Sequence, residues 1–598
     1  MPGGFIGVDI FFVISGYLIS SIILKNLRDG TFTFRDFYGR RVKRILPALI
    51  AVLGFVLIAG WFLLLPAEYK QLGKHVAAGA GFISNFVLWN ESGYFDSAAE
   101  AKPLLHLWSL SIEEQFYILW PLALYLAHRA KTNFYTPLIL AITGASFALN
   151  IYSINNNPEA AFYSPATRFW ELMLGSMLAL RTMRTGASLQ SPLQGNLKAV
   201  AGAALLLVAT MTIDRESRFP GWWALLPTAS AYLLISAGAG TWVNRNLLSM
   251  RALVWIGLIS YPLYLWHWPI LTLLRAVENG QPTTLQYIAA ILASVTLAWA
   301  TYRLIEKPIR FGKWGGKKVL VLCMSMCVVA GIGLTTYANG GFSSRYSSEI
   351  RQLADFKYDP SGPYRSGSCF LRADQSVNLF SSSACTKPAL AGAPSIYLWG
   401  DSYAAHLYPG LEYEFAKTEN VIQLTSVGCP PVHGLQWTPR CDAINSFVLQ
   451  QISKDVPHRV ILAARWSGHG WAKIADGVSE TIVQLKKIGV ERIDLVGQMP
   501  EWSDTLPKSL YKAYEMDEAH RIPQRMTFGL AGGGEAFDEK LREFSRKNGV
   551  NYISPRRILC NQDGCLTMVG GNLDALISFD RGHLTVPASR HMVSQFPK

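Results

Sequence analysis

The first 338 residues of this chain contain ten apolar runs of about the length that a helix needs to cross a lipid bilayer, which is about 20 residues. The runs lie near residues 5–24, 45–65, 113–128, 136–153, 163–181, 197–213, 222–239, 252–274, 285–304 and 318–337. Hydrophobic residues make up 50% of the whole chain and charged residues only 16%, fewer than in an average soluble protein. The sequence therefore predicts a multi-span α-helical membrane domain.

The formal net charge of +14 is concentrated beside these runs. Basic residues gather at 25–44, 128–131, 181–184, 245–251 and 307–318, and such clusters are typical of cytoplasmic loops. With these five clusters inside, the alternation of spans places the region after residue 338 outside the cytoplasm. We expect the lipid bilayer, and no nucleic acid, to account for the positive charge.

Two features complicate this alternation. The apolar stretch 76–90 would break it by spanning, so we interpret that stretch as re-entrant or interfacial. The same alternation places residue 1 outside, although Met1 to Gly4 lead directly into an apolar run with no basic segment ahead. We expect either a further span upstream of this start or an unusual insertion of the first helix.

The second half of the chain is more polar. A Gly- and Ser-containing stretch at 339–393 indicates a linker or a disulfide-pinned extension. Beyond it, apolar runs at 395–399, 459–464 and 492–497 alternate with helical patterns such as 478–488, which is typical of a parallel sheet covered by helices. The sequence predicts three parts: a membrane domain at 1–338, the extension at 339–393 and an α/β domain at 394–598.

Cysteine usage agrees with an oxidising location for the polar half. Six of the eight cysteines lie there, at Cys369, Cys385, Cys429, Cys441, Cys560 and Cys565. Six cysteines allow fifteen pairings, and proximity along the chain favours Cys369 with Cys385, Cys429 with Cys441, and Cys560 with Cys565. The spacing does not match that of zinc ligands, so we expect no metal site.

Two short motifs indicate nucleophilic chemistry. Gly400-Asp401-Ser402 follows the apolar run 395–399, which would place a serine hydroxyl at the carboxyl edge of a sheet. Near the C-terminus, Asp580 and His583 are three residues apart, so the carboxylate could orient an imidazole that acts as the serine's base. A plain turn is the alternative for Gly-Asp-Ser, but the preceding strand and the second motif favour catalysis.

On these motifs, residues 394–598 resemble an SGNH-type hydrolase or transferase domain with a flavodoxin-like parallel sheet. The resemblance implies an oxyanion hole, to which the backbone N–H of Gly428 would contribute; a turn glycine beside a disulfide is an equal alternative. The family's Gly-x-Asn-Asp block is absent after the strand at 459–464. Arg465 follows that strand and either supplies an oxyanion donor instead or only pairs with a carboxylate.

Three longer motifs mark the membrane half: Gly3-Gly4-Phe5-Ile6-Gly7-Val8-Asp9, Arg40-Arg41-Val42-Lys43-Arg44 and His106-Leu107-Trp108-Ser109-Leu110-Ser111-Ile112-Glu113. Through them, residues 1 to about 338 resemble the acyltransferase-3 family of integral-membrane acyltransferases. The resemblance implies that Arg41 and Arg44, on one helix face, hold phosphates of a cytoplasmic acyl-coenzyme A, and that Glu113 belongs to the membrane site. Topological anchoring by positive charge is the alternative for the two arginines.

Fused proteins of this kind are similar to the enzymes that O-acetylate lipopolysaccharide O-antigen and, more distantly, peptidoglycan. The resemblance implies a multi-pass protein of the bacterial inner membrane whose C-terminal domain lies in the periplasm. We expect acetyl-CoA as the acyl donor, no bound cofactor, and a surface glycan or lipid-linked oligosaccharide as acceptor. The alternatives are a membrane-anchored carbohydrate esterase, a peptidoglycan O-acetyltransferase and a non-catalytic glycan or lipid translocator.

Overall fold

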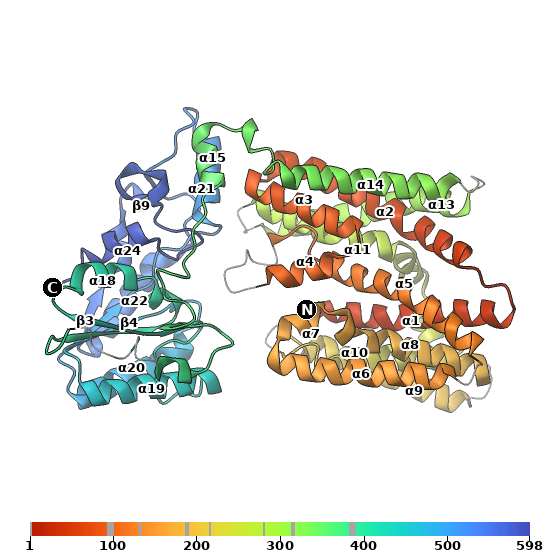
Figure 1. The fold of residues 1–598 in the computed structure, drawn as a ribbon, viewed down its shortest axis with the longest axis horizontal. Coiled ribbons are helices and arrows are strands. Elements are labelled where there is room, and N and C mark those ends of the chain that lie inside the picture. Colours follow the sequence, from red (N-terminus) through yellow and green to blue (C-terminus); the bar gives the residue numbers. More distant parts are fainter. Residues whose placement is uncertain are drawn as a thin grey trace. The chain divides into compact units, whose positions relative to one another are not determined.

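The structure of this chain is a computed structural model that describes residues 3–92, 101–130, 134–185, 191–214, 217–278, 282–312, 317–381, 385 and 390–597. It divides into two compact units, drawn in Figure 1. The first consists of Met1–Glu278 with Pro282–Phe342, and the second is built from Ser343–Lys598.

In the first unit, all the regular elements of the described residues are helices (Figure 1). Its α-helices are α1 (Gly7–Arg28), α2 (Phe34–Leu63), α3 (Pro66–Ala80), α4 (Ser84–Glu91), α5 (Leu107–Arg129), α6 (Tyr135–Asn156), α7 (Pro158–Tyr163), α8 (Pro165–Thr185), α9 (Pro192–Thr212), α10 (Leu225–Ala237), α11 (Arg251–Val277), α12 (Thr284–Ala300), α13 (Lys307–Phe311) and α14 (Lys317–Ala338), with π-helical turns η4 (Val243–Leu248) and η5 (Thr301–Glu306). Local sequence fixes several starts: Thr33, Ser191 and Thr283 each accept a hydrogen bond from a backbone N–H of the first turn.

Each of the ten apolar runs lies largely or wholly within the helices. Among the described residues, six helices are long and apolar enough to cross a membrane: Gly4–Arg28, Phe34–Leu63, Tyr135–Asn156, Pro192–Thr212, Thr284–Phe311 and Lys317–Ala338. Helices α5 and α8 are not among the six, and they bury ionisable side chains such as Glu113 and Arg168. Helix α10 is apolar but shorter, with 13 residues. The stretch 76–90 is split between α3 and α4, because Phe82 has a φ of 54° and interrupts the helix.

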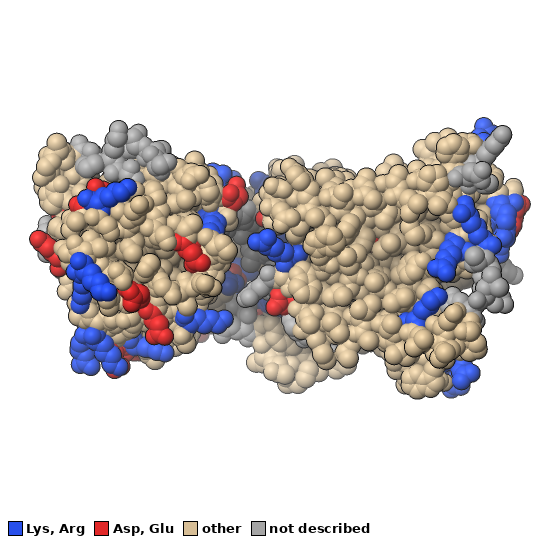
Figure 2. Space-filling view, turned by 90° about the horizontal axis from the view of Figure 1, so that it is seen from below, with Lys and Arg blue, Asp and Glu red and all other residues tan. Residues whose placement is uncertain are grey.

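The side surface of this unit is apolar. Large hydrophobic side chains are exposed on many helices, among them Leu18, Ile58, Phe62, Leu292 and Val328. Figure 2 shows a face that is mostly free of charge, with most of its Lys and Arg towards one end of the helices. An apolar surface of this extent is stable in contact with lipid, and the fold agrees with the predicted membrane domain.

Helices α1 and α8 pack backbone against backbone. A Cβ atom on Gly16 would lie 1.9 Å from the carbonyl oxygen of Leu172, and one on Gly175 would lie 2.1 Å from that of Val13. Such close approach requires glycine on both helices. It also brings Asp9 of α1 within 2.8 Å of Arg168 of α8.

The second unit contains a six-stranded sheet with the order β1-β3-β2-β4-β5-β7, whose paired strands are all parallel. The strands are β1 (Phe370–Leu371), β2 (Ser395–Gly400), β3 (Asn420–Ser426), β4 (Arg459–Ala463), β5 (Arg492–Val496) and β7 (Asn551–Ile553); a small antiparallel sheet joins β6 (Arg525–Met526), β9 (Gly564–Leu566) and β8 (Cys560–Asn561). From β3 to β7 the order is that of flavodoxin-like folds. The predicted α/β domain with a parallel sheet is confirmed.

Helices cover both faces of the large sheet. They are α15 (Ser348–Ala354), α17 (Ser402–Ala405), α18 (Tyr408–Phe415), α21 (Leu506–Met516), α23 (Pro555–Leu559) and α24 (Val586–Val593) around one core, and α19 (Pro439–Asp455), α20 (Trp471–Ile488) and α22 (Gly534–Lys547) around the other. The three disulfides are Cys369–Cys385, Cys429–Cys441 and Cys560–Cys565, which confirms the pairing that chain proximity favours.

The described part of the segment 339–393 is built into the second unit from Ser343 onwards. Ile350 and Leu353 of α15 lie in its core, and β1 is the edge strand beside β3. Tyr364 is fully buried and donates a hydrogen bond of 2.6 Å to the carbonyl oxygen of Leu584. This segment therefore behaves as an extension of the domain and not as a free linker.

The close contact between α1 and α8 generates a prediction. We expect Gly16→Ala to lower the stability of the purified full chain by on the order of 3 kcal/mol, because the added methyl group meets backbone atoms that cannot rotate away. The thermal unfolding midpoint in detergent measures the effect. Gly54→Ala is the matched control, since a Cβ atom there meets no atom within 4 Å; equal midpoints for the two variants would contradict the packing.

Candidate active site

Ser402 lies at the carboxyl end of β2, where the strand turns into α17. The turn requires glycine at position 400, because its φ is 152° and a Cβ atom there would lie 1.7 Å from the carbonyl oxygen of Ala463. Asp401 caps α17 by accepting the N–H of Tyr403 at 2.8 Å. The chain order β3, β2, β4 makes this edge the topological switch point of the sheet, the usual position of a site in such folds.

His583 and Asp580 meet Ser402 as the two motifs predict. Nε2 of His583 is 2.9 Å from Oγ of Ser402, and Nδ1 of His583 is 2.6 Å from Oδ2 of Asp580. Oδ1 of Asp580 accepts the N–H groups of Gly582 and His583 at 2.9 and 2.8 Å. Burial opposes ionisation of Asp580, but His583 and these backbone N–H groups outweigh burial and lower the pKa of Asp580 to about 2.

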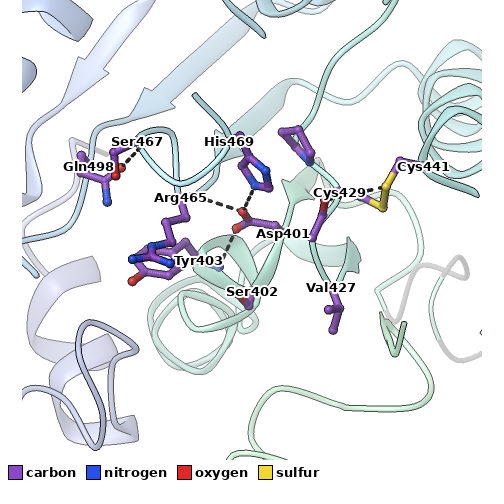
Figure 3. A network of polar contacts seen from close by, with 12 residues as sticks. Asp401, Ser402, Tyr403, Val427, Cys429, Cys441, Arg465, Ser467, His469 and Gln498 are labelled. Atoms are coloured by element: carbon purple, nitrogen blue, oxygen red, sulfur yellow. Dashed lines mark hydrogen bonds and ion pairs between the residues drawn. A yellow bond between two sulfur atoms is a disulfide. The ribbon is translucent and has the colours of Figure 1, made fainter. Parts of the chain in front are cut away.

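Asp401 joins the turn after β2 to the loop after β4 (Figure 3). Its Oδ2 accepts the backbone N–H of Arg465 at 3.0 Å and lies 2.7 Å from Nε2 of His469. The backbone N–H of Arg465 is therefore engaged by Asp401. The sequence did not predict His469, because only the fold brings it close to Asp401.

The guanidinium of Arg465 pairs with Glu501 through two hydrogen bonds, from Nε at 2.9 Å and from Nη2 at 2.8 Å. Of the two roles that the sequence left open for Arg465, the structure thus shows the pairing with a carboxylate, and its oxyanion role stays a prediction. Glu501 also accepts the hydroxyl of Tyr403 at 3.0 Å and the amide of Gln498 at 2.7 Å. Hydrogen bonds to Glu501 raise the pKa of Arg465, so the guanidinium stays protonated.

His406 lies behind the triad. It is fully buried on α17's C-terminal side, with its ring 5.2 Å from that of Tyr403 and 6.1 Å from that of His583. Burial and the nearby His583 lower the pKa of His406 well below its usual range, so its ring is neutral at pH 7. His406 was not among the residues that the sequence singled out; its position four residues after Ser402, one helical turn along, is the signal that could have found it.

Gly428 lies in the turn after β3, beside the Cys429–Cys441 disulfide, with a φ of 68°. The residue is exposed, and within the described residues its N–H donates no hydrogen bond. The guanidinium of Arg440 holds this turn through the carbonyl oxygen of Val427 at 3.1 Å. The geometry accords with both roles, turn glycine and oxyanion donor, and the second stays a prediction.

In the helical unit, the structure brings Arg41, Arg44 and Glu113 into neighbouring clusters. Nη1 of Arg44 is 3.2 Å from Oε1 of Glu306, a partner that the sequence did not indicate. Glu113 accepts the hydroxyl of Ser15 at 2.5 Å and also that of Tyr117. The guanidinium of Arg41 lies 5.8 Å from the centre of the Tyr117 ring.

A third polar cluster of this unit is fully buried. Arg168 pairs with Glu171 at 3.1 Å, as their spacing suggests, and with Asp9 at 2.8 Å. The guanidinium also lies over the rings of Phe12 and Trp108, 5.7 Å from each. These contacts form a buried ion cluster that joins α1 to α8.

Each half of the chain matches a known protein family. Residues 2–303 match the family model described as an acyltransferase domain, and residues 368–598 match one described as an SGNH domain fused to AT3 domains. The periplasmic domain of a lipopolysaccharide acetyltransferase from Salmonella ser. Paratyphi A has 27% sequence identity; the match covers 42% of this chain and 96% of that one, with a TM-score of 0.36.

Curated relatives are similar over about half the chain. YrhL of Bacillus subtilis, which carries a provisional name as a peptidoglycan O-acetyltransferase, is 35% identical over 324 residues, 52% of this chain and 51% of that protein. The peptidoglycan O-acetyltransferase OatA of Listeria monocytogenes is 32% identical over the same shares, and the O-acetyltransferase OatA of Staphylococcus aureus is 31% identical over 52% of this chain and 53% of its own. The chain thus matches about half the length of these relatives.

The depressed pKa of Asp580 generates a prediction about stability. An unfolded aspartate titrates near pH 3.9, so the ionised carboxylate stabilises the folded state above about pH 4 and this contribution disappears as the pH falls through about 2. We expect Asp580→Asn to lower the free energy of unfolding at pH 7 by on the order of 1 kcal/mol. This figure is smaller than the pKa shift alone would give, because the partly exposed carboxylate is screened by solvent. Urea unfolding of the full chain, followed by tryptophan fluorescence, measures the difference.

As a control, Asp563→Asn alters an exposed carboxylate of the β8–β9 hairpin. The loss in free energy of unfolding caused by Asp580→Asn should become smaller as the pH falls from 5 towards 2. Asp563→Asn should cause no loss at any pH in this range. A loss for Asp580→Asn that is constant over this range would contradict the stabilisation of the ionised carboxylate by His583.

Proposed function

This chain belongs to the acyltransferase domain family, and from that premise we propose that it is a membrane O-acetyltransferase that acetylates a hydroxyl of a cell-surface glycan. The observation that carries the proposal is the hydrogen-bonded series Ser402, His583 and Asp580 in a domain joined to a membrane acyltransferase domain. A serine of this kind holds an acyl group as an ester and passes it to a second oxygen.

In the first step, Nε2 of His583 takes the hydroxyl proton of Ser402 while Oγ forms a bond to the acetyl carbonyl carbon. The bond from that carbon to the leaving group breaks, and the leaving group takes the proton from His583. In the second step, a glycan hydroxyl gives its proton to His583 and attacks the ester, and Oγ of Ser402 recovers the proton as it leaves. Asp580 orients His583 and stabilises its protonated form.

On the membrane side, we propose that Arg41 and Arg44 hold phosphates of acetyl-CoA and that Glu113 belongs to the same site. Arg41 is the stronger candidate, because among the described residues its guanidinium forms no ion pair and its buried Nε has no hydrogen-bond partner. The guanidinium of Arg44 is already paired with Glu306. Guanidinium groups suit phosphate oxygens because their N–H donors form a planar fork.

We also propose that the protein lies in the bacterial inner membrane with its second unit in the periplasm. Three disulfides support this location for the second unit. The position of the basic clusters beside the apolar runs supports the orientation of the helices. Coenzyme A would then bind on the cytoplasmic side, and the acetyl group would cross through the helical unit to the serine.

The acceptor that we propose is the O-antigen of lipopolysaccharide, with peptidoglycan as the second candidate. The SGNH resemblance and the fused domain order support the first. The names of the Listeria monocytogenes and Bacillus subtilis relatives favour the second. Both acceptors present sugar hydroxyls outside the cytoplasm, so the same serine chemistry serves either one.

The central prediction concerns Ser402. We expect Ser402→Ala to abolish O-acetylation of the surface glycan, with a loss of about a thousandfold or more, because no other hydroxyl replaces an activated serine. Mass spectrometry of O-antigen and of muropeptides from complemented deletion cells measures the acetyl content and identifies the acceptor. Ser453→Ala, an exposed serine on α19, is the matched control.

Retained acetylation in Ser402→Ala cells would favour a translocator without serine chemistry. A second experiment distinguishes acetyl transfer from ester hydrolysis. The purified full chain is incubated with p-nitrophenyl acetate and de-O-acetylated glycan. Acetylated glycan supports the proposal, whereas free acetate alone would identify an esterase.

A further prediction concerns the donor. We expect Arg41→Ala to raise the KM for acetyl-CoA about tenfold or more, since a hydrogen bond to a charged group contributes about 1.5–3 kcal/mol. Arg40→Ala is the control, because Arg40 is the exposed neighbour on the same helix. Acetyl-CoA-dependent glycan acetylation by inverted membrane vesicles gives the KM, and equal effects of the two substitutions would argue for anchoring by charge alone.

A further inference from the structure

A cavity of about 240 Å³ lies at the carboxyl edge of the large sheet. Its lining includes Ser467 from the loop after β4, Gln498 and Glu501 from the loop after β5, and Arg556 after β7. Figure 3 shows Ser467 and Gln498 on the opposite side of Arg465 from the Cys429–Cys441 disulfide. The cavity therefore follows the same sheet edge that presents Ser402.

Glu501 connects this cavity to the triad. Its carboxylate lines the cavity and accepts the hydroxyl of Tyr403, whose ring centre is 4.7 Å from that of His583. The next residue, Trp502, donates its N–H to the carbonyl oxygen of Arg581 at 2.8 Å. These bonds tie the part of the cavity wall formed by Glu501 and Trp502 to Tyr403 and to the turn that carries His583.

The lining suits a sugar. Ser467, Gln498 and Arg556 offer donors and acceptors for hydroxyl groups, while Phe537, Leu530 and Met499 offer apolar surface for C–H faces. Among the described residues, the guanidinium of Arg556 has no carboxylate within ion-pair distance, so its donors are available to a ligand. The volume is below the roughly 300–1,000 Å³ of pockets for drug-sized ligands, which indicates one sugar unit.

We propose that this cavity is a subsite for one sugar unit of the acceptor glycan, held next to the unit whose hydroxyl receives the acetyl group from Ser402. The inference rests on the proposed function for its biological role, but the binding itself does not depend on transfer. Arg556 and Gln498 bind hydroxyl oxygens of the sugar, and Phe537 contacts its ring.

Gly532 gives a way to fill the cavity without disturbing the chain. It lines the cavity, its φ lies outside the left-handed region, and a Cβ atom there meets no atom within 4 Å. Gly532→Leu should therefore place a side chain in the space that the sugar needs. Gly362→Leu is the matched control, because Gly362 is also exposed and unobstructed but does not line the cavity.

The test uses the full chain in detergent, with Ser402→Ala as the background that prevents turnover. Isothermal titration with oligosaccharide from de-O-acetylated O-antigen, and separately with a tetramer of N-acetylglucosamine, gives Kd values. We expect Gly532→Leu and Arg556→Ala to weaken binding of the accepted oligosaccharide about tenfold or more, and Arg556→Lys to restore part of it. Gly362→Leu and Arg557→Ala, the exposed neighbour on α23, should leave Kd unchanged.

Unchanged Kd values for Gly532→Leu and Arg556→Ala would overturn the inference, as would failure of the Ser402→Ala chain to bind either oligosaccharide. An unaltered thermal unfolding midpoint establishes that a variant is folded. Failure of the proposed function has a different signature: the chain with Ser402 intact would transfer no acetyl group to an oligosaccharide that it binds through the cavity.

Discussion

The carboxylate of Asp401 is the interaction on which the arrangement of the second unit's site depends. It accepts the N–H of Tyr403 and the N–H of Arg465 and lies beside His469, so it joins the turn after β2 to the loop after β4. These two strands flank the switch point of the sheet. Hydrogen bonds to a buried carboxylate are stronger than neutral ones, and this set holds Ser402 and the Arg465–Glu501 pair in one rigid frame.

The helical unit follows a different constraint. Its outer surface is apolar and stable in lipid, so its polar side chains turn inward and pair with one another in clusters. Arg168 with Asp9 and Glu171 is fully buried, and Glu113 is held by Ser15 and Tyr117. The glycine contact between α1 and α8 makes the first cluster possible, because only close helices bring Asp9 and Arg168 together.

Local patterns in the sequence predicted the features that depend on local order. The strand before Ser402, the spacing of Asp580 and His583, and the three disulfides joining near neighbours all follow from residues close in the chain. The ion pairs of Glu501, Glu306 and Asp9 escaped prediction, because each partner lies between 36 and 262 residues away and only the packed fold defines the pairing. The ten predicted runs are helical, but the burial of charged residues in α5 and α8 makes apolarity alone a poor measure of which helices lie in the bilayer.

A parallel sheet delivers the ends of all its strands to one edge, and this geometry would let one domain combine the proposed chemistry with the proposed binding of the acceptor. Ser402 follows β2, Arg465 follows β4, Glu501 follows β5 and Arg556 follows β7, so successive strands present successive positions along a line. Neighbouring strands are about 4.8 Å apart, so a row of three or four strand ends spans roughly the length of two sugar units. An acceptor aligned along this edge would meet the nucleophile at one end and a binding cavity at the other, without any change in the fold.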